Sequence, residues 1–279
     1  MRKVKLIALD LDGTLLNTNK QLSSENAAAL RRASEEGIEI VPATGRFYRG
    51  MPEIIRDLPF VHYVIGINGA EVYDAASKRA VCESELSWQH AVSIMEYLDT
   101  LPVIYDCYQR GWGYMTKTLY DQAEDYAPTA HNLEMIRNLR TPVPDLKSYI
   151  REKKAGVQKI QFFFRDMALR AELLRSLPEK YPDLVVTTSI VNNIEINSRE
   201  ATKGAALQKL AEHLGIRMEE TVAFGDDLND VTMLKAAGIG IAMGNAAESV
   251  KAAADHVTSD CDHSGVAEAM KRYLWDADL

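Results

Sequence analysis

Short apolar runs alternate with helix-forming stretches at both ends of this chain, and this alternation restricts its possible folds more than any other feature of the sequence. Near the N-terminus, apolar runs at 4–9 and 38–43 flank an Ala- and Leu-rich stretch at 24–36. Serines precede that stretch and Gly37 follows it, as is typical at the two ends of a helix. The pattern predicts a βαβ unit, in which a helix joins two parallel strands.

A third apolar run, at 63–67, predicts another buried parallel strand in the N-terminal part of the chain. The alternation of helix and strand patterns returns near the C-terminus. Helices and strands are expected there in turn, at 203–214 (helix), 221–224 (strand), 230–237 (helix), 238–242 (strand) and 246–253 (helix). Both ends are therefore predicted to build one α/β core, a doubly wound and mainly parallel sheet of the Rossmann-like class.

The middle of the chain has a different pattern. Aromatic-rich runs at 103–108 and 113–116 flank Arg110-Gly111, which is a hairpin signal. The remaining elements expected there are helices at 88–101, in pieces over 120–152 and at 167–180, and strands at 157–164, 184–188 and 193–196. Hairpins mixed with helices indicate an α+β module.

The length of 279 residues favours two domains, at roughly 100–200 residues each. We expect residues 1–82 and 193–279 to form a discontinuous core. Residues 83–192 are expected to form the inserted second domain.

Charge and composition exclude several classes of protein. The chain carries 32 Lys and Arg against 40 Asp and Glu, a net charge of −8, whereas nucleic-acid binding needs clustered basic residues. No apolar run approaches the roughly 18 residues of a membrane span, and Asp10 follows the basic start too soon for a signal peptide. The three cysteines fit neither a disulfide framework nor a zinc site. We expect a cytoplasmic protein that binds a small molecule, with no nucleic-acid, membrane or protein partner implied.

Polar residues follow three of the predicted core strands. The segments are Asp10-Leu11-Asp12-Gly13-Thr14 after the first strand, Thr44-Gly45-Arg46 after the second, and Gly225-Asp226-Asp227-Leu228-Asn229-Asp230 after the strand at 221–224. In open α/β sheets, ligands bind at the carboxyl ends of the strands. These residues are therefore candidates for a functional site.

Four aspartates in these segments indicate a metal site. Asp10 and Asp12 point to the same side of an extended segment, where two negative charges disfavour joint ionisation. Asp226 and Asp227 add to this repulsion unless a cation lies among them, and oxygen ligands favour Mg²⁺. The alternative is that the segment after the first strand is only a solvated turn.

Lys203 indicates a phosphate site. A lysine in the first turn of a helix opposes the helix dipole, and a phosphate held by the ammonium and the helix-end amides would offset this. The alternative is a solvated surface lysine. Thr44 and Gly45 offer a hydroxyl and an amide that could hold a phosphoryl oxygen, or they form a simple turn.

Four sequence motifs carry a resemblance to a known family. DLDGT at 10–14, ATGR at 43–46, TKG at 202–204 and GDDLND at 225–230 resemble, in this order, the motifs of the haloacid dehalogenase superfamily. MGNA at 243–246 and the insert make the chain similar to the Cof-type phosphatases of subclass IIB. The resemblance implies a haloacid dehalogenase core with an inserted α+β cap of the C2B type, which selects the substrate. The segments Ser198–Ala201 and Cys261–Ser264 depart from the family pattern.

The resemblance also implies catalytic roles. Asp10 would be the nucleophile that forms an aspartyl-phosphate, and Asp12 the general acid that protonates the leaving group and then activates water. Mg²⁺ would be held by the Asp10 carboxylate, the Asp12 backbone carbonyl and Asp226, with Asp227 as a further candidate. The phosphoryl oxygens would be held by the Leu11 amide, Thr44, the Gly45 amide, Lys203 and Asn229, which is expected to contact the phosphate or Asp10.

Three further positions have expected but less specific roles. Asp230 is expected to brace its loop and cap the next helix. Arg46 would reach the substrate or the cap, or form a surface ion pair. Asn68 ends the third strand on the same edge and could contact the body of the substrate.

The resemblance implies a Mg²⁺-dependent phosphatase that hydrolyses phosphate monoesters of small metabolites, with sugar phosphates as the expected class. Asp12 supports phosphoryl chemistry, since related dehalogenases lack this second aspartate. One alternative is a sugar phosphomutase of the phosphomannomutase type. The other is a non-catalytic sensor of phosphorylated metabolites.

Overall fold

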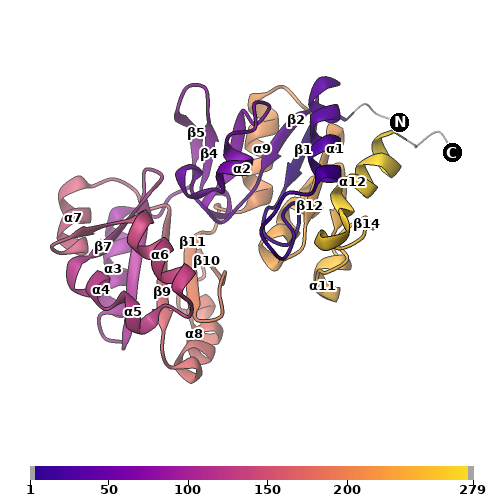
Figure 1. Cartoon of the computed structure of the whole chain (residues 1–279). Helices are drawn as coiled ribbons and strands as arrows, with labels where there is room; N and C mark the ends of the chain where they lie inside the picture. The colour runs from indigo at the N-terminus through magenta and orange to yellow at the C-terminus, as the bar shows by residue number, and fades with distance from the viewer. Residues whose placement is uncertain (1–3, 276–279) are drawn as a thin grey trace. The chain divides into compact units, whose positions relative to one another are not determined.

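The computed structural model describes residues 4–275 and divides into two compact units (Figure 1). The first unit contains the residues up to Glu83 and those from Thr202 onward. The second contains Ser84–Ala201. The chain therefore has a discontinuous core, interrupted by an inserted domain.

A five-stranded parallel sheet forms the centre of the core unit. Its strands, in spatial order, are β14 (His256–Val257), β13 (Ile239–Ala242), β12 (Thr221–Gly225), β1 (Leu6–Leu9) and β2 (Glu39–Pro42). Every neighbouring pair is parallel, which confirms the predicted α/β class.

Helices cover both faces of this sheet. They are α1 (Ser24–Glu35), α2 (Glu53–Arg56), α9 (Lys203–His213), α10 (Val231–Ala236), α11 (Glu248–Lys251) and α12 (Gly265–Met270). Ile7 and Leu9 of β1 pack with residues of α1 and α12, whereas Leu6 and Ala8 pack with residues of α9 and α10. Successive side chains of a strand point to opposite faces, so an uninterrupted apolar strand is what a doubly wound sheet requires.

The third predicted strand has a different setting from the one expected. β3 (Tyr63–Gly66) joins the parallel sheet through a parallel bridge between Ala43 and Ile65. It otherwise pairs antiparallel with β4 (Glu71–Asp74), which pairs with β5 (Arg79–Glu83). The expected buried parallel strand is therefore present on its side toward β2, but its other edge is antiparallel, because the chain returns at once in a hairpin instead of crossing over through a helix.

The inserted unit is built on a six-stranded sheet. Its strands, in spatial order, are β10 (Leu184–Thr187), β11 (Asn193–Ser198), β9 (Lys159–Phe164), β6 (Val103–Gln109), β7 (Trp112–Thr116) and β8 (Arg140–Val143). All pairs are antiparallel except β7 with β8. The predicted hairpin turn has φ values of 53° at Arg110 and 67° at Gly111, the two consecutive left-handed residues that tight hairpins favour.

Helices of the insert flank its sheet. They are α3 (Trp88–Leu98), α4 (Lys117–Asp121), α5 (Ala123–Tyr126), α6 (Ala130–Leu139), α7 (Leu146–Lys153) and α8 (Met167–Lys180). Residues of α3, α7 and α8 share one apolar core with the sheet. The insert therefore has a hydrophobic core of its own.

Two details of the insert differ from the predicted ones. The helical stretch expected over 120–152 is interrupted by β8, because Pro142 and Pro144 disfavour helix and leave this segment extended. The insert also continues past residue 192, since β11 pairs with β9 and β10 and so places residues 193–201 in this unit.

Within residues 4–275, no helix combines the length and the apolar character that crossing a membrane requires.

Candidate active site

The candidate residues that follow core strands meet at one edge of the parallel sheet. β12, β1 and β2 are neighbours, so the segments that follow them leave the sheet side by side. Lys203, the first residue of α9, reaches the same place. The sheet order thus brings together residues that are up to 220 positions apart, from Asp10 to Asp230.

Lys203 lies between two carboxylates. Its Nζ donates to Asp10 Oδ1 and to Asp230 Oδ1, both at 2.6 Å, and its side chain is completely buried. Burial opposes the charged form, but the two carboxylates outweigh it and raise the pKa of Lys203. The alternative of a solvated surface lysine is therefore wrong, and these carboxylates offset the unfavourable position of a cation in the first turn of α9.

Asp230 braces the loop after β12, as expected, but its side chain makes no capping hydrogen bond to α10, which was also expected. Its Oδ2 accepts hydrogen bonds from the backbone amides of Asp226 and Asp227, at 2.9 and 3.0 Å. Its other oxygen is taken by Lys203. Asp230 thereby ties this loop to the start of α9.

Asp226 is fixed by residues of the first motif. Thr14 Oγ1 donates to Asp226 Oδ1 at 2.6 Å. Gly13 has a φ of 92°, and a Cβ at this position would lie 2.4 Å from Asp226 Oδ2. A glycine is needed here both for the backbone conformation and for the close approach of the carboxylate.

The carboxylates of this site fit a bound cation. One oxygen each from Asp10, Asp226 and Asp230 lies within 4.8 Å of the others. Burial, with a contribution from neighbouring carboxylates, raises the pKa of Asp10 to about 8 and that of Asp226 to about 6. A divalent cation would restore the ionised forms, and hard oxygen donors suit Mg²⁺. Asp230 is occupied by Lys203 and two amides, so Asp10 and Asp226 are the better ligands.

Asp227 is directed elsewhere. Its Oδ1 accepts from the Leu228 amide at 2.7 Å and caps the short helix Leu228–Asp230. This side chain does not belong to the acidic cluster of Asp10, Asp226 and Asp230.

Asp12 is held by two cations. Arg46 Nη2 lies 3.1 Å from Asp12 Oδ2, and Lys20 Nζ lies 2.9 Å from Asp12 Oδ1. Burial acts to raise the pKa of Asp12, but Arg46 and Lys20 together outweigh it and hold the pKa below its usual range. Arg46 was expected to reach the substrate or the cap, or to form a surface ion pair. The structure shows an ion pair, and its partner is Asp12, the expected general acid.

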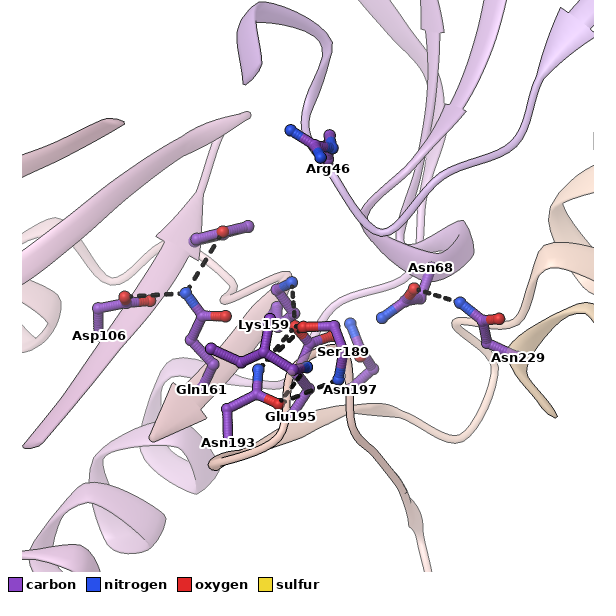
Figure 2. Close-up of polar contacts among 12 residues, drawn as sticks. Arg46, Asn68, Asp106, Lys159, Gln161, Ser189, Asn193, Glu195, Asn197 and Asn229 are labelled. Carbon is purple, nitrogen blue, oxygen red and sulfur yellow. Dashed lines mark hydrogen bonds and ion pairs between the residues drawn. The ribbon is translucent and has the colours of Figure 1, made fainter. Parts of the chain in front are cut away.

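Thr44, Asn68 and Asn229 form the third side of the site. Thr44 is 2% exposed, and its carbonyl accepts from the Asn68 amide at 3.0 Å. The side chain of Asn229 donates to Asn68 Oδ1 at 3.2 Å (Figure 2), and its expected contact with the phosphate or Asp10 stays a prediction. A Cβ at Gly45 would lie 2.9 Å from Asn68 Oδ1, so Asn68 packs directly on the expected phosphate-binding turn.

The backbone that carries Asn68 is strained. Ile67, Asn68 and Gly69 have φ values of 54°, 59° and 98°, three left-handed residues in succession. Such a conformation is unfavourable for a β-branched residue and is found where function requires it. The sequence offered no signal for the strain at Ile67, nor for the pairing of Lys20 with Asp12.

Comparison with known proteins agrees with this geometry. Residues 7–270 match the haloacid dehalogenase-like hydrolases. The chain belongs to this family. The expected resemblance is thus confirmed, and the protein is a phosphoric monoester hydrolase of the haloacid dehalogenase type.

Curated relatives and a solved structure support the assignment along the whole chain. Phosphatase YwpJ of Bacillus subtilis is 36% identical, over 97% of this chain and 100% of the relative. The 5-amino-6-(5-phospho-D-ribitylamino)uracil phosphatase YcsE of the same organism is 33% identical, over 97% and 96%. A solved sugar phosphatase of haloacid dehalogenase subclass IIB has a TM-score of 0.77 at 25% identity, over 97% of this chain and 99% of that one.

Proposed function

We propose that this phosphatase depends on Mg²⁺ and hydrolyses phosphate monoesters of small metabolites through an aspartyl-phosphate on Asp10. The observation that carries the proposal is the completely buried Lys203, whose ammonium joins Asp10 to Asp230. Burying a lysine between carboxylates costs desolvation free energy, which hydrophobic packing would avoid. The ammonium would stabilise the negative charge that develops when the Asp10 carboxylate attacks the phosphate, and this catalytic role accounts for the cost.

The reaction proceeds in two displacements. An oxygen of Asp10 attacks phosphorus, and the bond to the ester oxygen breaks while Asp12 gives that oxygen a proton. Asp12, now ionised, then takes a proton from water. The water oxygen attacks phosphorus, inorganic phosphate leaves, and the Asp10 carboxylate is restored.

Asp12 must carry a proton in the first displacement, although Arg46 and Lys20 hold it ionised in the structure. A substrate phosphate is negatively charged and competes with Asp12 for these two cations. Substrate binding would therefore raise the pKa of Asp12 and prepare it as an acid.

The phosphoryl oxygens are assigned to Lys203, Thr44 and the backbone amides of Gly45 and Leu11. Such donors stabilise negative charge as it spreads in the transition state. Asn229 takes part through its hydrogen bond with Asn68, which packs on Gly45.

The metal site is assigned to the carboxylates of Asp10 and Asp226 and to the backbone carbonyl of Asp12. Bound Mg²⁺ supplies positive charge that offsets the charge of the phosphate. The raised pKa values of Asp10 and Asp226 support the assignment, because burial disfavours the ionised carboxylates and a bound cation would offset that cost.

Sugar phosphates are the proposed substrate class. The solved subclass IIB relative is a sugar phosphatase, and the named substrate of YcsE carries its phosphate on a ribityl chain. A phosphate-release screen over phosphorylated sugars, nucleotides and cofactors tests the class. The highest kcat/KM is expected for a sugar phosphate, whereas a nucleotide or cofactor as best substrate would contradict the class.

A further inference from the structure

The C-terminal part of the core contacts the catalytic loop at several points. We call residues 260–267 the C-terminal clamp, and residues 10–21 the catalytic loop. The clamp contains the whole of Cys261–Ser264, a segment that departs from the family pattern. The four-motif mechanism gives no role to it.

The outer part of the catalytic loop is tied to Asp262. Both the backbone amide and the hydroxyl of Thr18 donate to Asp262 Oδ1, each at 2.9 Å. The loop is shaped locally by Asn17 Oδ1, which accepts from the amides of Asn19 and Gln21. Lys20, in the same turn, forms the ion pair with Asp12.

The inner part of the loop is tied by two asparagines. Asn26 is completely buried, donates to the Leu15 carbonyl at 3.2 Å and accepts from the Ala267 amide at 3.0 Å. Asn245, from the MGNA segment, donates to the Gly13 carbonyl at 2.8 Å and accepts from the Cys261 amide at 3.0 Å. The clamp thus contacts the outer part of the loop directly and is connected to the inner part through Asn26 and Asn245.

The loop is held locally by its own backbone hydrogen bonds, such as those from the Leu16 amide to the Leu11 carbonyl at 2.8 Å and from the Asn17 amide to the Gln21 carbonyl at 3.0 Å. The clamp adds contacts from outside the loop. The loop's bridges outside named strands are Asp12 with Leu16 and Leu16 with Leu22. Displacement of a catalytic group by about 1 Å can lower a rate by about two orders of magnitude. Contacts that hold the loop therefore bear directly on the position of Asp12.

We propose that the C-terminal clamp positions the catalytic loop for proton transfer, with Asp262 as a positioning residue for Asp12. The inference rests on the proposed phosphatase mechanism. Asp262 itself touches no reacting atom. Its carboxylate fixes Thr18, and Thr18 fixes the turn that brings Lys20 to Asp12.

Two substrates separate this role from a general loss of stability. Phenyl phosphate has a poor leaving group that needs the proton from Asp12, whereas 4-nitrophenyl phosphate releases a stable phenolate without it. Asp262→Ala is expected to lower kcat/KM for phenyl phosphate about tenfold more than for 4-nitrophenyl phosphate, since general acid catalysis contributes about 100-fold or more. Asp262→Asn keeps the accepting oxygen and should retain the wild-type ratio.

Thermal unfolding of both variants shows whether the fold is intact, which is expected because Asp262 is exposed. An equal loss on both substrates in Asp262→Ala, or no loss on either, would overturn the inference. So would an Asp262→Asn variant as impaired as Asp262→Ala. If the wild type hydrolyses neither ester, the proposed function fails instead, so the two failures are distinguishable.

Discussion

At the residue scale, the site depends on how charge is compensated among Asp10, Asp230 and Lys203. A lysine in the first turn of a helix is unfavourable, and this singled out Lys203 in the sequence as a candidate phosphate ligand, which stays a prediction. The sequence could not show that two carboxylates share this ammonium, since Asp10 and Asp230 meet it only through the order of strands in the folded sheet.

Removing the ammonium should both destabilise the protein and abolish activity. Lys203→Met keeps the length of the side chain but leaves two buried carboxylates without their cation. We expect the free energy of unfolding in urea to fall by about 3 kcal/mol, because breaking a buried ion pair from one side is costly. Lys235→Met, on the exposed side of α10, is the control and should change stability by less than about 0.5 kcal/mol. Equal stability of the two variants would argue against the role given to Lys203.

The raised pKa of Asp226 gives a prediction for pH. With a pKa of about 6 in the folded protein and 3.8 as the ordinary value, folded Asp226 binds more protons than the unfolded chain between these values. The metal-free wild type should therefore lose stability relative to Asp226→Asn as pH rises from about 4 to about 6.

Thermal unfolding in EDTA at a series of pH values measures this difference. Adding Mg²⁺ should raise the melting temperature of the wild type more at pH 8 than at pH 5, because cation and protons compete for the carboxylates. A Mg²⁺ effect of the same size in Asp226→Asn would contradict the assigned ligand.

At the element scale, the candidate site residues lie at the ends of strands and at the start of a helix. The short apolar runs predicted the parallel strands, and the helical pattern with its capping residues predicted α1. The N-cap side chain of Ser23 accepts a hydrogen bond from the Asn26 backbone amide, as expected. β8 was missed because its pairing with β7 is non-local, and the prolines around it indicated only a break. Lys20 was missed because no local pattern reports that a turn folds back onto Asp12.

The turn after β3 should be sensitive to substitution through its contact with α9. Gly69 has a φ of 98°, and a Cβ there would lie 2.2 Å from the Thr202 carbonyl oxygen and 2.8 Å from the Lys203 amide. Gly69→Ala should therefore destabilise the fold and displace the start of α9, which lowers kcat.

Gly37→Ala is a matched control, because Gly37 has a φ of 82° but no atom within 4 Å of its added Cβ. The control should cost only the left-handed strain, about 1–2 kcal/mol. Urea unfolding should show a larger loss for Gly69→Ala. Equal losses would mean that the contact with Thr202 is unimportant.

At the scale of the whole molecule, the chain forms two units with separate hydrophobic cores. The core unit holds the assigned catalytic residues and resembles other members of its family along its length. The insert combines its apolar core with buried ion pairs on its sheet. Arg140 pairs with Asp106 at 2.8 Å, and Lys159 pairs with Glu195 at 3.0 Å (Figure 2). Sequence patterns predicted that an insert exists, but only strand pairing showed that it extends to residue 201.

The central claim is that Asp10 transfers the phosphoryl group with help from Mg²⁺. The most direct measurement is phosphate release from 4-nitrophenyl phosphate by the wild type and by Asp10→Asn, each with Mg²⁺ and with EDTA. We expect release only by the wild type with Mg²⁺, and a folded but inactive Asp10→Asn variant. Turnover by Asp10→Asn at the wild-type rate, or unchanged wild-type turnover in EDTA, would contradict the account.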